Sequence, residues 1–269
     1  MHTRHPRQPK SRPPAPTPIP WRIHVVMRRP LRHAVVLLRG PNKLFATFSW
    51  DLDTDRIEIG QMMRRACIDP QECDLSEDGR WFQLHISNNR FDDPVTGGNY
   101  TVIARPPYVH AVYLTPTRVI RELIHVYPPI PPELQHAFCS NIFSALPREG
   151  WVRAAAVSSA THHYSKAVNA RWTLVRCMHT REEDEDNLPA HYNTHVLVRD
   201  DGVWVDLPEW NWADVDGGDL VWGREGRLWR AREIHPDSPT DRKELADFRD
   251  LRFRQLRAPY DESRASTSR

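Results

Sequence analysis

Short polar turns that end in glycine recur along this 269-residue sequence, and each one precedes a segment in which apolar and polar residues alternate. These turns are Asp78-Gly79, Asp201-Gly202, Asp216-Gly217-Gly218 and Glu225-Gly226. After the first turn, Phe82, Leu84 and Ile86 fall on one face of an extended chain. Tight hairpins need positive φ in the turn, which glycine accepts, and a period of two is typical of half-buried strands. The pattern predicts two-residue hairpin turns and an all-β fold.

The last three turns lie close together, in HVLVRDDGVWVDLPEWNWADVDGGDLVWGREGRLWRA, from His195 to Ala231. Short strands joined by short turns form an antiparallel meander, and a four-stranded meander is the unit of a β-propeller blade. The same segment holds five tryptophans: Trp204, Trp210, Trp212, Trp222 and Trp229. Because successive side chains of a strand point to opposite faces, we expect most of these rings to pack in the core and one or two to be exposed at a rim.

Several stretches resemble parts of a WD-repeat blade. FSWDLDTDRIEIG, from Phe48 to Gly60, is similar to the end of such a blade: a strand that closes on Trp50-Asp51, a polar turn and a further strand. DLSEDGR resembles the turn that opens the next blade, at a spacing that fits the ~40–45-residue period of these repeats. WADVDGGDLVWGREGRLWRA resembles the same turn and strand pair. The resemblance implies a β-propeller-like chain of four-stranded blades, four to five in number, although the Gly-His pair common in WD-repeats is missing.

The chain also resembles a group of uncharacterised bacterial proteins that share an ending of the kind DLPEWNWADVDGGDLVWGREGRLWR, from Asp206 to Arg230. That group carries no function that can be transferred. This resemblance therefore adds nothing to the functional interpretation.

Composition divides the chain into one domain and two tails. Residues 1–30 are rich in Pro, Arg and Lys and have little to bury, so we expect a disordered basic leader there. The β-propeller-like domain is expected over residues 31–258, and a disordered polar tail over residues 259–269. Within the domain, residues 116–168 do not fit the repeat and are expected to form an irregular, helical insertion.

Two further elements can be placed from the pattern. Pro132 beside Glu133 is a sound helix start, and apolar residues follow at helical spacing, so a short amphipathic helix is expected. Near the end, SPTD at 238–241 resembles a helix cap, whereas LRFRQL at 251–256 alternates like a strand. We expect a final strand there that helps to close the sheet.

The charge of the chain is small overall, at +2, but uneven along it. No Asp or Glu precedes Asp51, whereas ten Lys and Arg residues do. Such an arm could contact nucleic acid, an anionic membrane or an acidic partner, but a solvated leader is the interpretation we favour. Nucleic-acid binding through this arm is the alternative.

Targeting signals and zinc motifs are not recognisable in the sequence. The apolar run Ala34 to Leu38 is too short for an export signal or a membrane span, which needs ~20 apolar residues. The four cysteines lack the paired spacing of a zinc site: Cys67, Cys73, Cys139 and Cys177. We therefore expect a soluble protein of the reducing cytoplasm, with its cysteines packed as small apolar residues.

Three groups of residues could carry chemistry, and each has a plainer structural interpretation. His191 and His195 are four apart, but they run into an expected strand and lack the Glu of the zinc-protease motif. His162 and His163 lie near serines, in what we expect to be a surface loop. The acids Asp51, Asp53, Asp55 and Glu58 resemble a calcium loop, but the Gly and Glu that such a loop needs are replaced by Arg56 and Met62. A turn in which Asp caps its own backbone is the better account.

No residue is therefore assigned as catalytic, cofactor-binding or metal-binding, and no cofactor is expected. The function we favour is a non-enzymatic β-propeller-like scaffold for protein–protein interaction, with a protein partner of unknown identity. The alternative is a hydrolase whose site is assembled from several blades, using His162–His163, His191–His195 and the acids at 182–186. Both hypotheses rest on the fold class rather than on a recognised site.

Overall fold

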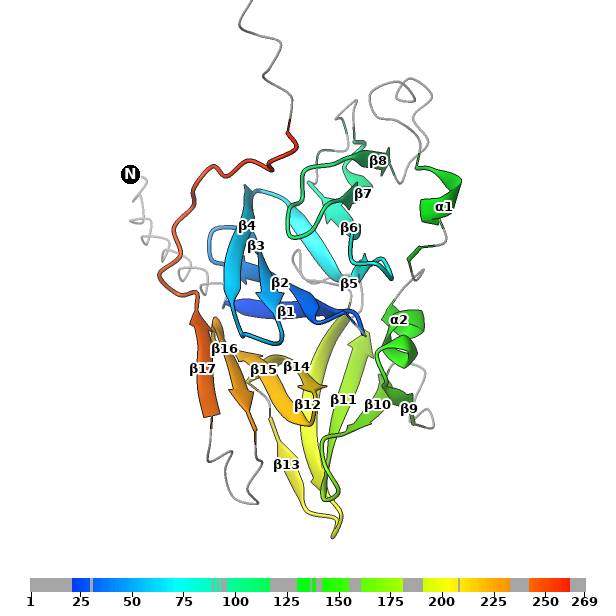
Figure 1. The fold of residues 1–269 in the computed structure, drawn as a ribbon, viewed down its shortest axis with the longest axis vertical. Coiled ribbons are helices and arrows are strands. Elements are labelled where there is room, and N and C mark those ends of the chain that lie inside the picture. The colour runs from blue at the N-terminus through cyan, green and yellow to red at the C-terminus, as the bar shows by residue number, and fades with distance from the viewer. Residues whose placement is uncertain are drawn as a thin grey trace, which may run out of the picture.

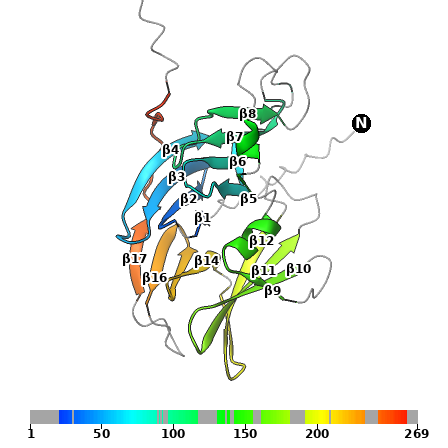
Figure 2. The ribbon, with the colours of Figure 1, turned by 45° about the vertical axis from the view of Figure 1, so that its right-hand side comes forward.

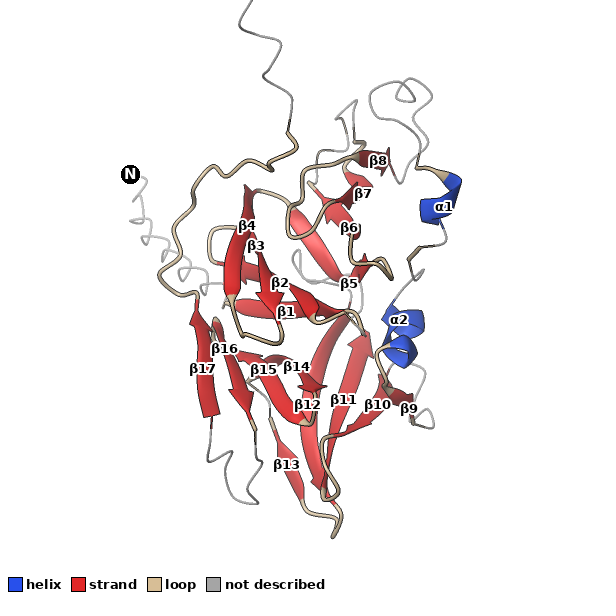
Figure 3. Cartoon of the chain, in the orientation of Figure 1, coloured by secondary structure: helices blue, strands red, loops and turns tan. Residues whose placement is uncertain are grey.

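The protein is almost entirely β-structure (Figure 3). In the computed structural model, the chain is described over residues 21–29, 31–88, 90, 92, 96–116, 130–135, 137–138, 142–154, 161–180, 191–207, 209–232 and 242–261. Within these ranges there are two short helices, α1 (Pro132–Gln135) and α2 (Ile142–Arg148), and all other regular elements are strands. The all-β prediction is confirmed.

The strands form four antiparallel sheets, in which chain neighbours are sheet neighbours. Blade 1 contains β1 (Arg22–Met27), β2 (His33–Gly40), β3 (Leu44–Asp51) and β4 (Ile57–Arg64). Blade 2 contains β5 (Cys67–Leu75), β6 (Phe82–Ser87), β7 (Asn99–Ala104) and β8 (Tyr113–Pro116). Blade 3 contains β9 (Val152–Arg153), β10 (Thr161–Ala167), β11 (Trp172–Thr180), β12 (His191–Arg199) and β13 (Trp204–Asp206). Blade 4 contains β14 (Trp210–Asp216), β15 (Asp219–Arg224), β16 (Arg227–Ala231) and β17 (Arg242–Asp247).

The four sheets are arranged as the blades of a propeller ring (Figures 1 and 2). The expected four to five blades are thus four, three of them four-stranded and blade 3 five-stranded because β9 adds an edge. Strand β1 contacts β5 of blade 2 and β14 of blade 4, and β14 also contacts β12 of blade 3. The first strand of the chain is therefore central to the ring.

Burial on both faces explains the apolar run in β2. Val35 and Leu37 pack into the core shared by blades 1 and 2. Val36 and Leu38, on the opposite face, pack into the core shared by blades 1 and 4. Because successive strand residues point to opposite faces, the middle of a strand between two interfaces is buried on both sides, and in β2 it is a continuous apolar run.

The other two interfaces differ from each other. Blades 3 and 4 share an apolar core that includes Leu174, Leu220 and several tryptophans. Between blades 2 and 3 lies helix α2, which contacts β5 on one side and β9 on the other (Figure 2). Arg148 of α2 also pairs with Asp74 of β5, with Nη1 and Oδ2 3.6 Å apart. Within the described residues, blades 2 and 3 are therefore joined by a helix and an ion pair, whereas the other neighbouring blades share an apolar core.

Two of the expected two-residue hairpin turns are confirmed. Gly217 and Gly218 connect β14 to β15 with φ values of 60° and 91°, and Glu225 and Gly226 connect β15 to β16 with 48° and 78°. Positive φ at both turn residues is the requirement of a type I′ hairpin.

The other two turns are longer than the sequence pattern predicted. Asp78-Gly79 lies in a six-residue connection, 76–81, in which the Ser76 hydroxyl donates to the Asp78 carboxylate. At Asp201-Gly202, a turn closed by the Gly202 N–H on the Arg199 carbonyl precedes β13. In both loops a single glycine has positive φ. Neither loop has the second residue of positive φ that a type I′ turn requires.

The boundaries of the domain need three corrections. Strand β1 lies inside residues 1–30, expected as leader, because Ile23 and Val25 complete the core between blades 1 and 4. The segment 116–168 contains β9 and β10 as well as the helices, so part of it belongs to blade 3. In the expected tail, the Tyr260 hydroxyl donates to the His110 carbonyl and accepts from the Arg105 N–H.

The expected helix and final strand are also corrected. Helix α1 begins at Pro132 as predicted, but it ends at Gln135 and a separate helix, α2, follows. The last strand is β17 at Arg242–Asp247, and LRFRQL forms no strand. Leu251, Phe253 and Leu256 pack against the core shared by blades 1 and 4, so the alternation of this segment reflects side-chain burial without a partner strand.

Candidate functional site

A ladder of three parallel tryptophans crosses blade 4 and ends at a surface pocket. The rings of Trp210 and Trp222 have centroids 4.7 Å apart and planes 8° apart, and those of Trp222 and Trp229 are 6.3 Å and 13° apart. Trp222 is only 3 % exposed, whereas Trp229, its cross-strand partner, is half-buried. The ladder therefore runs from the core between blades 3 and 4 out to solvent.

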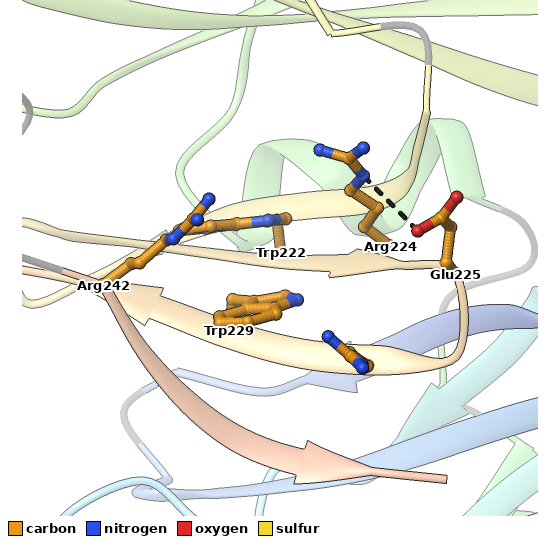
Figure 4. Close-up of a pocket in the computed structure, with 6 residues that line it drawn as sticks. Trp222, Arg224, Glu225, Trp229 and Arg242 are labelled. Atoms are coloured by element: carbon orange, nitrogen blue, oxygen red, sulfur yellow. Dashed lines mark ion pairs between the residues drawn. The ribbon is translucent and has the colours of Figure 1, made fainter. Parts of the chain in front are cut away.

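The pocket at the end of this ladder has a volume of about 230 Å³ and combines aromatic rings with cations (Figure 4). We call it the Trp–Arg pocket, and it is lined by Trp222, Arg224, Glu225, Arg227, Trp229 and Arg242. The indole rings lie between Arg242 on one side and the Arg224–Glu225 ion pair on the other (Figure 4). Three arginines against one carboxylate make the lining cationic.

The three arginines of the pocket differ in how far their charge is neutralised. Arg227 pairs with Asp247, with Nε and Oδ2 3.1 Å apart, and Arg224 pairs with Glu209 and Glu225. Arg242 is exposed, and its guanidinium lies 5.4 Å from the centre of the Trp229 ring. Among the described residues it has no carboxylate within ion-pair distance, so it is the cation most available to a ligand.

A second exposed aromatic lies on blade 3. Trp204, at the end of the β12–β13 hairpin, is 63 % exposed. Its neighbour Val203 is also exposed, whereas Val205 packs against the core between blades 3 and 4. The expectation of a mostly buried tryptophan cluster with one or two rings at a rim is confirmed by Trp204 and Trp229.

A buried charged cluster lies where the blades meet, and we call it the central cluster: Glu149, Trp151, Lys166, Arg176 and Asp214. Lys166 of β10 and Asp214 of β14 form an ion pair with Nζ and Oδ1 2.5 Å apart. The Trp151 indole N–H donates to the other Asp214 oxygen at 3.3 Å. Asp214 therefore serves three donors, since the Val215 N–H also reaches its carboxylate.

The remaining two charges of the central cluster are less well compensated. Arg176 of β11 donates to the Ala213 carbonyl and stacks on Trp151, 4.3 Å from the ring centre, and among the described residues no carboxylate pairs with it. Glu149, just after α2, lies 3.8 Å from the Arg28 guanidinium. Burial, followed by the charge of Asp214, raises the pKa of Glu149 to about 7. Burial likewise lowers the pKa of Lys166, against the opposing effect of Asp214.

The histidine pair His191 and His195 lies in β12, as the strand interpretation predicted. His195 is buried and its Nδ1 donates to the Trp210 carbonyl at 3.2 Å. Burial and the neighbouring charge of Arg176 lower the pKa of His195 to about 3. It is a neutral core histidine that connects blade 3 to blade 4.

The second histidine pair was misplaced. His162 and His163 lie in β10 rather than in a surface loop, and His162 contacts Arg153 of β9 at 3.0 Å. The apolar character of their neighbours comes from Tyr164 and Val168, which face the core of blades 3 and 4. The acids at 182–186 lie outside the described residues, so this combination with the histidines is not tested.

The acidic turn at 51–55 caps its own backbone, as predicted. The Asp51 carboxylate accepts from the N–H groups of Asp53 and Thr54 at 3.0 and 2.9 Å. Asp53 pairs with Arg32, and Asp55 pairs with Arg230 of blade 4, so the turn also links blades 1 and 4. Cys67, Cys73 and Cys177 are free thiols, and Cys139 is outside the described residues. No group of potential metal ligands is found within the described part of the chain.

Sequence reasoning missed the central cluster because its members stand singly in unrelated segments. A signal was nevertheless present, since Lys166 lies in phase with buried Tyr164 and Val168, and Arg176 lies in phase with Leu174 and Met178. A charge on the apolar face of an alternating strand indicates a buried polar site.

No protein-family profile matches the chain, and no curated protein matches it either. The two helices of the described residues have four and seven residues, and neither could cross a membrane. The interpretation of the molecule thus rests on its own fold and side chains.

Proposed function

We propose that this protein is a non-enzymatic β-propeller scaffold that binds another protein, and that an acidic segment of this partner docks in the Trp–Arg pocket. The observation that carries the proposal is the pair Arg242 and Trp229: an exposed guanidinium beside a half-buried indole, at the end of a rigid ladder of rings. Arg and Trp are the residue types that contribute most to binding energy at protein interfaces.

The surroundings of this pair support the same interpretation. Five of the six pocket residues lie on strands β15, β16 and β17, and the sixth, Glu225, lies in the tight turn between the first two, so the sheet holds these side chains in place. A cationic lining favours an acidic ligand and raises the rate of encounter with it. Trp204 on blade 3 offers a further exposed anchor for a partner larger than the pocket.

The test compares the full-length wild type with Arg242→Glu and with the control Arg252→Glu, an equally exposed arginine outside the pocket. The probe is a poly-glutamate dodecapeptide, and binding is followed by tryptophan fluorescence. We expect Arg242→Glu to weaken peptide binding by about tenfold or more, and the control to bind like the wild type. Equal affinity in all three proteins would contradict docking at this pocket.

The same three proteins, tagged, then serve as baits in native lysate. A stoichiometric protein that is retained by the wild type and the control but lost with Arg242→Glu would be the proposed partner. A nucleic acid that is lost on removing residues 1–20 and on adding salt would instead assign binding to the basic arm.

We also propose that the propeller is of the WD-repeat-like kind. It is supported by β3, which ends at Trp50-Asp51, and by the loop that contains Ser76 and Gly79 between β5 and β6. The free thiols of Cys67, Cys73 and Cys177 are compatible with the proposed location in the reducing cytoplasm.

A hydrolase with its site at the ring centre is the second candidate, favoured by the raised pKa of Glu149, which suits a general acid. The cavity there has about 40 Å³, far below the ~150 Å³ that accommodates benzene, so it does not enclose an organic substrate. Hydrolytic turnover in a substrate screen that is lost with Glu149→Gln would favour this candidate over the scaffold.

A further inference from the structure

Arg176 is a buried cation whose charge is not matched by its contacts. Its side chain is 2 % exposed, one terminal nitrogen donates to the Ala213 carbonyl, and Nε has no hydrogen-bond partner among the described residues. Burying a charged group is costly unless an opposite charge or sufficient hydrogen bonds compensate it. The cation–π contact with Trp151 supplies only part of that compensation.

The carboxylates of the ring centre are each paired with a cation. Lys166 pairs with Asp214, Arg28 with Glu149, and Arg148 with Asp74. Arg176 is the buried cation of this group without an ion pair among the described residues, and Asp214 attracts it only beyond ion-pair distance. Glu149 strengthens this imbalance because its raised pKa leaves it partly protonated at neutral pH, and its Oε2 has no hydrogen-bond partner among the described residues.

A small cavity adjoins this surplus charge. It has about 40 Å³ and is bounded by inner strands of the ring and by α2, with His24, Glu149, Trp151, Arg176 and Asp214 among its lining residues. A cavity needs ~10–15 Å³ to hold one water, so this one takes a water-sized ligand or slightly more. Its size suits a small ligand. The lining also holds the carboxylates of Asp74, Glu149 and Asp214, but each of them is ion-paired with a cation, so the cation without an ion pair, Arg176, favours a negative ligand.

We propose that this cavity binds a single small inorganic anion, of which chloride is the abundant example, with the Arg176 guanidinium as its main ligand. The anion supplies the negative charge that Arg176 lacks and a hydrogen-bond acceptor for its Nε. This site is independent of the proposed function, since it lies at the ring centre rather than in the Trp–Arg pocket.

Glu149 couples this site to pH. An ionised Glu149 repels the anion, so the anion binds with Glu149 protonated and binding weakens as the pH rises through about 7. The charged and titratable groups that face Glu149 or the cavity from the surrounding elements are His24, Arg28 and Arg29 from blade 1, Cys73 and Asp74 from blade 2, Arg148 from α2, Lys166 and Arg176 from blade 3, and Asp214 from blade 4.

The first experiment measures chloride binding directly, by ³⁵Cl NMR line broadening of full-length protein at constant ionic strength, with sodium gluconate replacing sodium chloride. We expect saturable broadening in the wild type and in the control Arg252→Gln, and its loss in Arg176→Gln. Broadening that is absent from the wild type, or unchanged in Arg176→Gln, would overturn the proposal and leave water in the cavity.

The second experiment uses Glu149→Gln and does not depend on whether Arg176→Gln folds. Wild-type affinity for chloride should fall about tenfold between pH 6 and pH 8, whereas Glu149→Gln should bind equally at both pH values. A wild type whose chloride affinity is the same at both pH values would contradict binding beside Glu149. Arg242→Glu should leave chloride binding unchanged in either experiment, which separates this site from the Trp–Arg pocket.

Discussion

Lys166 of β10 and Asp214 of β14 form a buried ion pair across the interface of blades 3 and 4, with Nζ and Oδ1 2.5 Å apart. Removing one member of a buried pair leaves the other charge uncompensated, at a cost of about 3–5 kcal/mol. We therefore expect Asp214→Ala to lower the free energy of unfolding by that amount, measured by urea denaturation. The double variant Lys166→Met/Asp214→Leu should cost less than Asp214→Ala alone, and a cost as large as that of the single change would contradict this account.

Gly223 of β15 allows blade 4 to approach the first strand of the ring closely. A Cβ at this position would lie 2.7 Å from the Cβ of Ile23 in β1, which belongs to the core of blades 1 and 4. We expect Gly223→Ala to lower the free energy of unfolding by about 1–3 kcal/mol, as overpacking does. Thermal and urea denaturation measure the loss.

A double-mutant cycle with Ile23→Ala tests the cause. The cost of Gly223→Ala should shrink in part in that background, because Cγ2 of Ile23, 3.0 Å from the added Cβ, is gone whereas its Cβ at 2.7 Å remains but can move more freely. Gly202→Ala is the control, since nothing lies within 4 Å of its added Cβ and only its φ of +85° opposes the change. If Gly223→Ala costs as much in the Ile23→Ala background as in the wild type, crowding by the Ile23 atoms beyond Cβ is not responsible.

Glu149 should make the protein less stable at alkaline pH. Its pKa rises on folding from 4.5 to about 7, so the folded state binds the proton more tightly than the unfolded chain. The stability this provides is complete below pH 4.5 and is lost as the pH rises through about 7. We expect Glu149→Gln to raise the melting temperature at pH 8 relative to the wild type and to change it little at pH 5. A melting temperature at pH 8 that is lower for Glu149→Gln than for the wild type would contradict the raised pKa.

His195 acts in the opposite direction. Its pKa falls on folding from 6.5 to about 3, so the stability linked to it is present above pH 6.5 and is lost as the pH falls towards 3. We expect His195→Asn, whose amide can still donate to the Trp210 carbonyl, to flatten the decline of stability between pH 6.5 and pH 4. If the stability of His195→Asn falls between pH 6.5 and pH 4 as steeply as that of the wild type, the decline comes from other groups, such as His24, whose pKa is also lowered to about 3.

Residues 1–20 and residues 21–30 should behave differently on truncation. Strand β1 pairs with β2 along its whole length and contributes Ile23 and Val25 to the core. We expect a protein that lacks residues 1–20 to keep the circular dichroism spectrum and cooperative melting of the full chain. A protein that lacks residues 1–30 should lose cooperative unfolding, and equal melting of the two truncations would show that β1 is dispensable.

The local elements of this fold were largely predictable. Alternation placed Phe82, Leu84 and Ile86 on the buried face of β6, and paired positive-φ residues fixed the hairpins at Gly217-Gly218 and Glu225-Gly226. These features depend on a few neighbouring residues, and backbone sterics decide them before any long-range contact forms.

The role of β1 and of LRFRQL was not predictable in the same way. Both segments carry apolar residues in a strand-like pattern, yet only β1 finds a backbone partner, while Leu251, Phe253 and Leu256 lie against blade 1 as coil. Whether a segment pairs depends on which sheet edge remains free once the ring has closed, and that is a property of the whole ring rather than of the segment.

The sequence by itself determined the all-β class, the tight turns of blade 4 and the burial of most tryptophans, because each follows from the local period and from turn sterics. The tertiary structure alone decided that Glu149, Lys166, Arg176 and Asp214 meet at the ring centre and that Arg242 lies beside Trp229. These residues are far apart along the chain, and no local pattern encodes their distances. Only the closing of four blades around a common centre brings the charges together. Burial then raises the pKa of Glu149, lowers the pKa values of Lys166 and Arg176, and leaves Arg176 without an ion pair among the described residues.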